Sequence, residues 1–288
     1  MTSKAVKWIY KTLYRNARGK YYSHNKNLWP YFKTSSLNTA TSYRGIEIKK
    51  YKSNPHTIKE KPLTLVFTGP SVNSTSQEYF DSDSYDLFGV NGAIAGFQGF
   101  RYYCIIDSGF VKNRSDLVKK IISEDKLVLF CSPSVISMVM DIFDVSDVKC
   151  YVNVLDIVSN GVCYPFLKKS FLVNGNTNPE LFNNERSLGF SSSIDSFVFD
   201  YNTVAYVALQ ISCSLGYKEI YMAGLDMTNF ASPRFYETLN NKQPTALEYY
   251  FHEIISCFDY AASFCSEKNI SVINLSKSSA IRSFPIRK

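Results

Sequence analysis

The chain has 288 residues, is 45% hydrophobic and carries a formal net charge of +7 at pH 7, which allows one large domain or two small ones. It has no run of 18 consecutive apolar residues, and its basic start lacks an apolar core of signal-peptide length, so neither a spanning helix nor export is expected. Seven scattered cysteines without a Cys-x-x-Cys pair predict buried thiols in a reducing compartment, and three histidines without a cysteine at ligand spacing argue against structural zinc.

Residues 1–62 differ in charge from the rest of the chain. They hold 14 Lys or Arg residues against Glu47 and Glu60, a net of +12, which leaves −5 for residues 63–288. Both tryptophans and eight tyrosines or phenylalanines lie in the same stretch. We expect an amphipathic helix within residues 1–20 and interpret residues 1–62 as a basic arm that binds an anionic membrane surface. A basic tail without a specific partner is the alternative. Nucleic acid is not expected, because no nucleic-acid-binding module follows.

Four apolar runs follow the arm, and each ends in small or acidic residues. They predict strands at residues 63–67, 86–90, 102–106 and 127–130, with a helical pattern at 114–123. Such runs are typical of a parallel sheet that helices cover on both faces. We therefore predict an α/β fold, with a Rossmann-like, mostly parallel sheet flanked by helices in residues 63–288. Residues 150–190 are rich in Asn, Ser and Phe, and we expect them to be irregular and to form a small lid or insertion.

Residues 200–236 carry the most informative pattern. Apolar residues recur with helical spacing from 204 to 215, and Gly216 ends this helix. Residues 220–223 then read as a buried strand that ends in Gly224-Leu-Asp226, so a carboxylate lies where a parallel strand meets its loop. Open α/β sheets bind ligands at this edge. A helix at 245–266 and a strand at 271–275 complete the expected fold.

This segment resembles two related families of sugar transferases. Gly216-Tyr-Lys-Glu-Ile-Tyr221 and the Gly-x-Asp end are similar to the bacterial sialyltransferases of the Campylobacter type. The chain is more similar to the WaaZ-type lipopolysaccharide core proteins, through Leu209-Gln-Ile211, Ser214-Leu215, Gly224-Leu-Asp226 and Arg234-Phe-Tyr236. The resemblance covers residues 63–110 and 186–284. It implies a glycosyltransferase that moves Kdo (3-deoxy-D-manno-octulosonic acid) from a CMP-activated donor to the inner core of lipopolysaccharide, at the cytoplasmic face of the inner membrane.

Residues at the strand ends are the candidate ligands of the donor. A glycine turn after a buried strand, as at residues 68–71, lets backbone N–H groups approach a phosphate, although a plain turn has the same sequence. Asp107 ends the third strand and can hold a ribose or acceptor hydroxyl. Loop capping is the alternative for Asn91 and Asp107. The resemblance places these residues at the donor nucleotide: Gly69, Pro70, Ser71, Asn91 and Asp226.

Further candidates would contact the donor phosphate or remove the acceptor proton. By resemblance, Asn202 and Thr203 meet the phosphate at a helix start, but the glycine that follows in the sialyltransferases is missing here, and helix capping is the alternative. Tyr236 matches a phosphate-binding tyrosine, and Thr228 stands where a second tyrosine is expected. Arg234 can pair with a phosphate or a sugar carboxylate, unless it is only a surface arginine.

His252 aligns with the histidine that the sialyltransferases use as general base, a role that suits an imidazole near neutral pH. A helix histidine without a catalytic role is the alternative, and Asp226 or Asp107 would then be the base.

Asp81-Ser-Asp83 has the Asp-x-Asp form of metal-dependent glycosyltransferases, but it lies too early in the predicted sheet for that role. We therefore expect no metal site, and no cofactor besides the CMP-sugar donor. Two other functions stay open. One is a CMP-sialic acid-dependent sialyltransferase that acts on lipooligosaccharide, and the other is a non-catalytic, membrane-associated factor in core assembly.

Overall fold

The computed structural model describes residues 4–28, 32–34, 40–47, 59–173, 182–183, 187–228 and 230–287. The chain forms two compact units, in which Met1–Tyr51 joins Ile105–Val173 (unit 1) and Lys52–Cys104 joins Asn174–Lys288 (unit 2). The first 51 residues thus share a unit with a segment from the middle of the chain. The division at residue 62, drawn from composition, stays a prediction.

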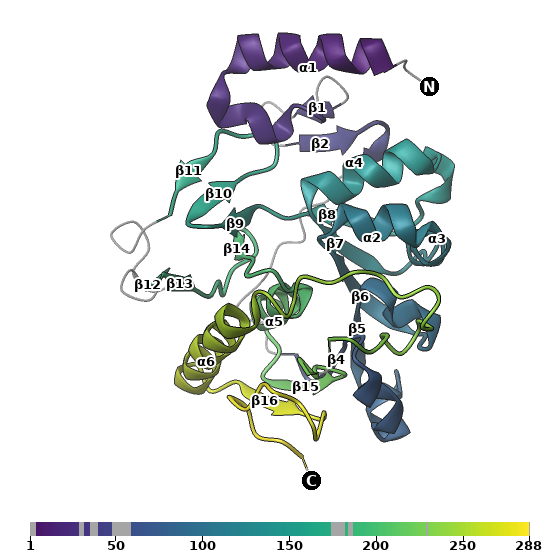
Figure 1. Ribbon diagram of the computed structural model, residues 1–288, viewed down its shortest axis with the longest axis vertical. Helices are drawn as coiled ribbons and strands as arrows, with labels where there is room; N and C mark the ends of the chain where they lie inside the picture. Colours follow the sequence, from purple (N-terminus) through teal and green to yellow (C-terminus); the bar gives the residue numbers. More distant parts are fainter. Residues whose placement is uncertain are drawn as a thin grey trace. The chain divides into compact units, whose positions relative to one another are not determined.

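The central element is a seven-stranded sheet with the strand order β16-β15-β4-β5-β6-β7-β8 (Figure 1). Its strands are β4 (Leu63–Val66), β5 (Asp86–Val90), β6 (Phe100–Ile105), β7 (Val128–Cys131), β8 (Tyr151–Val154), β15 (Glu219–Ala223) and β16 (Ser271–Asn274). The pairings described on both sides of β4 are parallel, with Ile220 and Asp86 opposite Leu63. The predicted parallel α/β sheet is confirmed.

Strand β8 was not among the predicted strands. It lies in residues 150–190, which we expected to be irregular, and it pairs in parallel with β7. Asn153 interrupts the apolar run of this strand, yet it is buried in the sheet. A buried polar residue within a four-residue strand hides the alternation by which strands are recognised.

Unit 2 contains the strands that surround the site. Its helices are α5 (Val204–Ser214) and α6 (Phe251–Glu267), and its short strands are β12 (Phe182–Asn183), β13 (Leu188–Gly189) and β14 (Val198–Phe199). Helix α5 packs on β4 and β5, and residues 205–214 are buried. Gln210 is fully buried and satisfies its amide by accepting from the backbone N–H groups of Ser191 and Phe199, each at 3.0 Å. Helix α6 begins six residues later than predicted.

The order of the strands creates a switch point between β4 and β15. From β4 the chain adds β5 and then β6 on one side, and it later returns to add β15 and β16 on the other side. The connection that follows β4 therefore runs toward one edge of the sheet, and the connection that follows its neighbour β15 runs toward the other edge. In open α/β sheets the carboxyl ends of two such strands border a crevice that binds ligands.

Unit 1 holds the predicted N-terminal helix, which is α1 (Lys4–Arg18). Its other helices are η1 (Lys20–Asn25), α2 (Ser108–Asn113), α3 (Ser115–Ile122) and α4 (Pro133–Ile142). Beside β7 and β8 it contains the antiparallel sheet β1 (Phe32–Thr34), β2 (Ala40–Tyr43) and β3 (Ile46–Glu47), and the antiparallel strands β9 (Ile157–Ser159), β10 (Val162–Tyr164) and β11 (Phe171–Leu172). Within the described ranges, no helix is long and apolar enough to cross a membrane.

Candidate functional site

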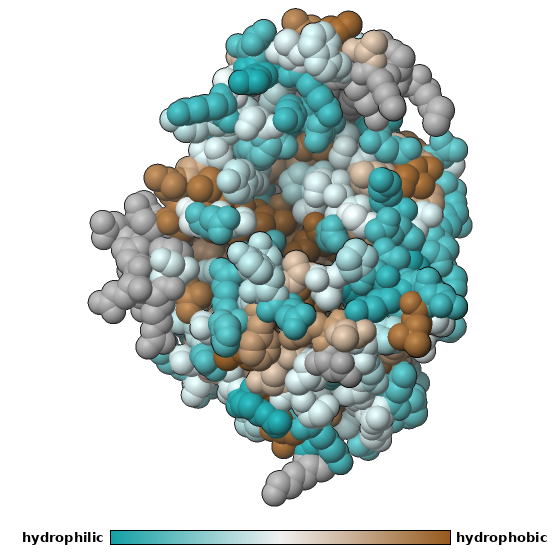
Figure 2. Space-filling model, in the orientation of Figure 1, coloured by the Kyte–Doolittle hydropathy of each residue, from teal (hydrophilic) through white to brown (hydrophobic). Residues whose placement is uncertain are grey.

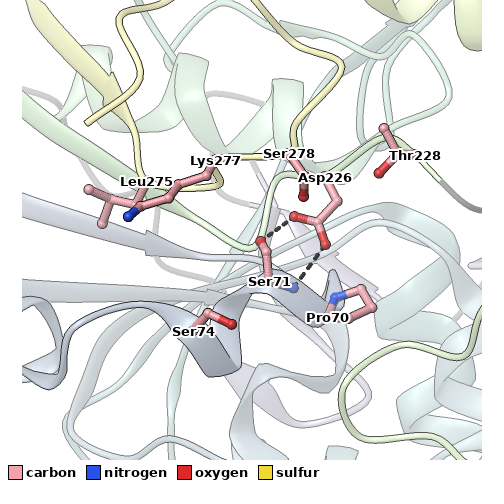
Figure 3. A pocket seen from close by; sticks show the side chains of 8 residues that line it. All are labelled: Pro70, Ser71, Ser74, Asp226, Thr228, Leu275, Lys277 and Ser278. Carbon is pink, nitrogen blue, oxygen red and sulfur yellow. Dashed lines mark hydrogen bonds between the residues drawn. The ribbon is translucent and has the colours of Figure 1, made fainter. Parts of the chain in front are cut away.

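The turn after β4 and the end of β15 are joined through Asp226. This carboxylate is only 7% exposed. Its Oδ2 accepts a hydrogen bond from the backbone N–H of Ser71 at 3.0 Å, and its Oδ1 accepts one from the Ser71 hydroxyl (Figure 3). Ser276, which follows β16, extends the network, because its Oγ lies 2.7 Å from Ser71 Oγ and accepts from the Gly224 N–H at 3.1 Å. Three neighbouring strands therefore end in one hydrogen-bonded cluster.

Gly69 is required by the close approach of two strand ends. Its N–H donates to the Gly224 carbonyl at 3.0 Å. A Cβ on residue 69 would lie 2.5 Å from that carbonyl oxygen and 2.6 Å from Asp226 Oδ2. These separations are shorter than carbon–oxygen contacts allow, so any larger residue would push the turn away from β15. The phosphate contact predicted for Gly69 stays a prediction, and close packing alone already requires a glycine here.

A pocket of about 480 Å³ opens beside this cluster. Its lining comes from the ends of β4, β15 and β16 and consists of Pro70, Ser71, Ser74, Asp226, Thr228, Leu275, Lys277 and Ser278 (Figure 3). The polar groups are hydroxyls, one carboxylate and the ammonium of Lys277. Such a mixture suits a ligand that carries both hydroxyls and negative charge. The pocket lies at the switch point between β4 and β15.

A second group of predicted residues meets after β5. Asn91 has a left-handed backbone with φ of 44°, and its carbonyl accepts from the Tyr103 hydroxyl at 2.7 Å. Burial raises the pKa of Tyr103 well above its ordinary value. The side-chain Oδ1 of Asn91 is buried and has no hydrogen-bond partner among the described residues. A Cβ on Gly92 would overlap the ring of Tyr236, so that ring packs directly on the turn.

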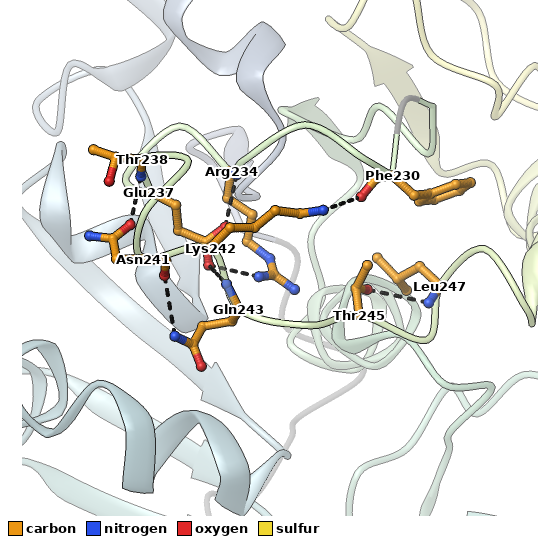
Figure 4. A network of polar contacts seen from close by, with 9 residues as sticks. All are labelled: Phe230, Arg234, Glu237, Thr238, Asn241, Lys242, Gln243, Thr245 and Leu247. Atoms are coloured by element: carbon orange, nitrogen blue, oxygen red, sulfur yellow. Dashed lines mark hydrogen bonds and ion pairs between the residues drawn. The ribbon is translucent and has the colours of Figure 1, made fainter.

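The loop between β15 and α6 is organised by Glu237 (Figure 4). The side chain of this glutamate is fully buried. It accepts from Arg234 Nη1 at 2.8 Å and from the Arg234 N–H at 3.0 Å. The N–H of Phe235 donates to the Thr68 carbonyl at 3.2 Å, which anchors the loop at the turn after β4. Arg234 therefore has a carboxylate partner, and the loop is fixed to the turn that precedes Ser71.

Comparison with known proteins identifies the family. A family model for the 3-deoxy-D-manno-octulosonic acid transferase WaaZ matches residues 57–286. The chain belongs to this family. Curated relatives include the probable 3-deoxy-manno-octulosonic acid transferases of Salmonella typhimurium and Escherichia coli, each 34% identical over 96 residues, or 33% of this chain. These matches span 35% and 33% of the relatives, about a third of their length.

Two solved structures are reported for comparison with this WaaZ family member. The MAf glycosyltransferase from Magnetospirillum magneticum AMB-1 has a TM-score of 0.50 at 15% identity, over 84% of this chain and 35% of that one. The sialyltransferase CstII from Campylobacter jejuni, in complex with the substrate analogue cytidine-5'-monophosphate, has a TM-score of 0.42 at 14% identity, over 80% of this chain and 85% of that one. The first likeness supports a glycosyltransferase fold.

Three other predicted residues of this WaaZ family member lie at helix starts. Thr203 caps α5, because its Oγ1 accepts from the Ala205 N–H at 3.3 Å. Asn202 has φ of 60° and donates to Glu253 on α6 at 3.0 Å. The neighbouring His252 is exposed. The capping that we considered for Thr203 is present, and donor contacts for these residues stay predictions.

The predicted ligand Asp107 lies outside these groups of residues, as does Asp81, for which no role was expected. Asp107 belongs to unit 1, where it caps α2 by accepting from the Gly109 N–H at 2.7 Å. The carboxylate of Asp81 makes a hydrogen bond within its own turn, because its Oδ2 accepts from the Ser84 hydroxyl at 2.6 Å. Among the described residues, no group of three or more His, Cys, Asp or Glu side chains is placed to hold a metal ion.

Several polar residues beside the predicted site residues were not themselves predicted to bind the donor or to act in catalysis. Ser276 and Lys277 follow the predicted last strand, so the rule that selected the other strand ends would have found them. Asp200 lies just before α5, and one of its oxygens is buried without a partner within the described part of the chain. Burial raises the pKa of this carboxyl to about 6. The buried Glu237 has no signal in the sequence, because only the folded loop encloses it.

Proposed function

We propose that this chain transfers a Kdo-type ulosonic acid from a CMP-activated donor to the inner core of lipopolysaccharide. Membership of the WaaZ family supports the sugar and the pathway. The observation that carries the proposal is the polar pocket at the switch point between β4 and β15. This is the position at which open α/β sheets bind nucleotides.

In this proposal the hydrogen-bonded cluster of Ser71, Asp226 and Ser276 holds the nucleotide. Asp226 fixes the turn of Gly69 to Ser71 through two hydrogen bonds, so the backbone of that turn is in place before the donor arrives. A carboxylate oxygen has more than one acceptor site, and Asp226 can therefore still accept from a ligand. Lys277 would supply positive charge toward the anionic part of the donor. The buried Oδ1 of Asn91 would accept a hydrogen bond from an N–H or O–H group of the ligand.

Arg234, Tyr236 and His252, in the loop and the helix that follow β15, would act on the reacting groups. The acceptor hydroxyl attacks the anomeric carbon of the ulosonic acid while the bond from that carbon to the CMP phosphate oxygen breaks. His252 takes the proton of the attacking hydroxyl, and CMP leaves with the bonding electrons. The Tyr236 hydroxyl and the Arg234 guanidinium would stabilise the phosphate charge that develops. Glu237 keeps Arg234 in a fixed position for this role.

The proposed acceptor is a glycolipid, so we place the protein at the cytoplasmic face of the inner membrane. The basic residues 1–62 would bring it to the anionic lipid surface, where each Lys or Arg contributes about 1 kcal/mol. Attraction of this kind concentrates the enzyme beside its acceptor.

Thermal stabilisation by nucleotides tests the donor assignment. CMP should raise the melting temperature, and UDP and GDP should not. Asp226→Ala should abolish the shift, whereas Asp125→Ala, an exposed turn residue, should keep it. Stabilisation by UDP or GDP but not CMP would contradict the proposal. Transfer of radiolabelled sugar to purified core acceptor then separates Kdo from sialic acid, and CMP binding without any transfer would favour a non-catalytic factor.

A further inference from the structure

The apolar arc of helix α1 faces away from unit 1. At 100° per residue, positions 5, 8, 9, 12, 13 and 16 form an uncharged arc of about 140°. All six residues are exposed, with Trp8 at 68% and Leu13 at 50%. The buried anchor of the helix is Tyr14, which lies on the opposite side at 2% exposure. An amphipathic helix in a globular unit normally buries its apolar arc, so this one presents it to something outside.

The β10–β11 hairpin presents a second group of exposed apolar side chains. Phe171 is 48% exposed and Leu172 is 71% exposed, and Tyr164 on the paired strand is also exposed. Helix α1, η1 and this hairpin together hold seven of the twelve large hydrophobic residues that are exposed in the described part of the chain. Figure 2 shows hydrophobic surface over α1 and again over β11. Both groups belong to unit 1.

Hydrogen bonds join η1, the segment that follows α1, to the loop of the hairpin. The fully buried Asn25, at the end of η1, donates to the carbonyls of Pro165 at 3.3 Å and Lys168 at 3.1 Å. Its Oδ1 accepts from the Leu167 N–H at 3.1 Å. The Ser170 N–H donates to the Tyr21 carbonyl at 2.9 Å. The segment that follows α1 is therefore bound to the loop of the hairpin.

The charge of this region selects an anionic partner. Residues 4–28 and 162–173 contain no Asp or Glu. Lys20 and Lys169 both lie over the ring of Tyr21, at 5.1 and 4.7 Å from its centre. Basic side chains beside exposed aromatic and aliphatic ones are the pattern of a surface that inserts at the boundary of an anionic bilayer.

We propose that α1 and the β10–β11 hairpin form one two-point contact surface for an anionic lipid bilayer, with Phe171 and Leu172 inserted beside the α1 arc. The inference rests on the membrane part of the proposed function and assigns the contacting elements. Because of this surface, membrane binding by the arm is better tested by substitution than by deletion. Deleting residues 1–55 would remove Asn25 and leave the hairpin loop without its partners, so substitutions are the cleaner perturbation.

Flotation of the full chain with phosphatidylcholine vesicles, with and without phosphatidylglycerol, tests this surface. Phe171→Ser with Leu172→Ser should lower binding to the anionic vesicles by roughly a hundredfold, since each of the two apolar side chains withdrawn from the bilayer costs about tenfold in affinity. Leu239→Ser with Tyr249→Ser, two exposed residues of unit 2, is the matched control and should bind as the parent does. CMP-induced stabilisation, measured on each variant, reports whether the nucleotide site is intact.

A labelled cysteine gives a second measurement that does not depend on loss of binding. All seven native cysteines are buried, so Leu172→Cys can be labelled selectively with an environment-sensitive dye. Its emission should shift to the blue on anionic vesicles, whereas the dye at Leu239→Cys should not respond. Parent-like flotation of the Phe171/Leu172 variant, or an unchanged spectrum at position 172, would overturn the proposal. Either result leaves the CMP experiment, and with it the transferase assignment, unaffected.

Discussion

The hydrogen bond between the Ser71 hydroxyl and the buried Asp226 carboxylate should contribute strongly to the free energy of unfolding. Asp226 is buried and accepts from both the N–H and the hydroxyl of Ser71. A hydrogen bond to a charged group contributes about 1.5–3 kcal/mol. Ser71→Ala removes the hydroxyl bond and keeps the backbone bond, whereas Asp226→Ala removes both. In a double-mutant cycle we therefore expect a coupling free energy of about 1.5–3 kcal/mol between the two side chains.

The assay is equilibrium urea unfolding of the parent, both single variants and the double variant. A control cycle with the same residue types is available in Asp81→Ala and Ser84→Ala, because the Ser84 hydroxyl donates to Asp81 at 2.6 Å on an exposed turn. Water competes for exposed partners, so the control coupling should be clearly smaller. If the Ser71–Asp226 coupling does not exceed the control, the view that Asp226 fixes the nucleotide turn is refuted.

Three further predictions concern the turn after β5, the residue Asp200 before helix α5, and the chemistry. Gly92→Ala should destabilise the fold by about 1–3 kcal/mol and weaken CMP binding, measured by denaturation and calorimetry, because the new methyl group displaces the Tyr236 ring; unchanged CMP affinity would contradict this. The pKa of Asp200 is raised to about 6, so its contribution to stability is present below its unfolded pKa near 3.8 and is lost as pH rises through about 6. In urea unfolding between pH 4 and 7, Asp200→Asn should therefore lose less stability than the parent as the pH rises. If the stability of the variant and of the parent falls in parallel with pH, Asp200 is not the cause. Transfer should survive EDTA, and Asp81→Ala with Asp83→Ala should keep near-normal rates, whereas inactivation by EDTA that Mn²⁺ reverses would show a metal requirement.

The strand ends were predictable because parallel strands have simple requirements. Buried strands need continuous apolar runs, and the residue after each run then lies at one edge of the sheet. That logic selected Gly69, Ser71 and Asp226, and the structure joins Ser71 to Asp226 and Gly69 to Gly224 by direct hydrogen bonds. It did not predict that Asp226 would use both oxygens on Ser71, because the partner is set by strand order, which the sequence leaves open.

Other features depend on tertiary contacts that no local pattern encodes. Periodicity shows that α1 is amphipathic but not which arc faces solvent, and the decision rests on the burial of Tyr14. Glu237 reads as an ordinary loop acid until the loop folds around it. Asn153 reads as a break in a strand, yet it lies buried within β8.

The switch point also has a consequence for how the chain folds. The Ser71–Asp226 contact joins positions 155 residues apart, so the nucleotide turn cannot be held until β15 has been added beside β4. Contacts of such long range form late and slowly. During synthesis, β4 must wait as an open edge whose hydrogen-bonding groups can pair with another chain. Fragments that end before residue 219 should therefore aggregate, and the ability to bind CMP would mark chains that have completed their sheet.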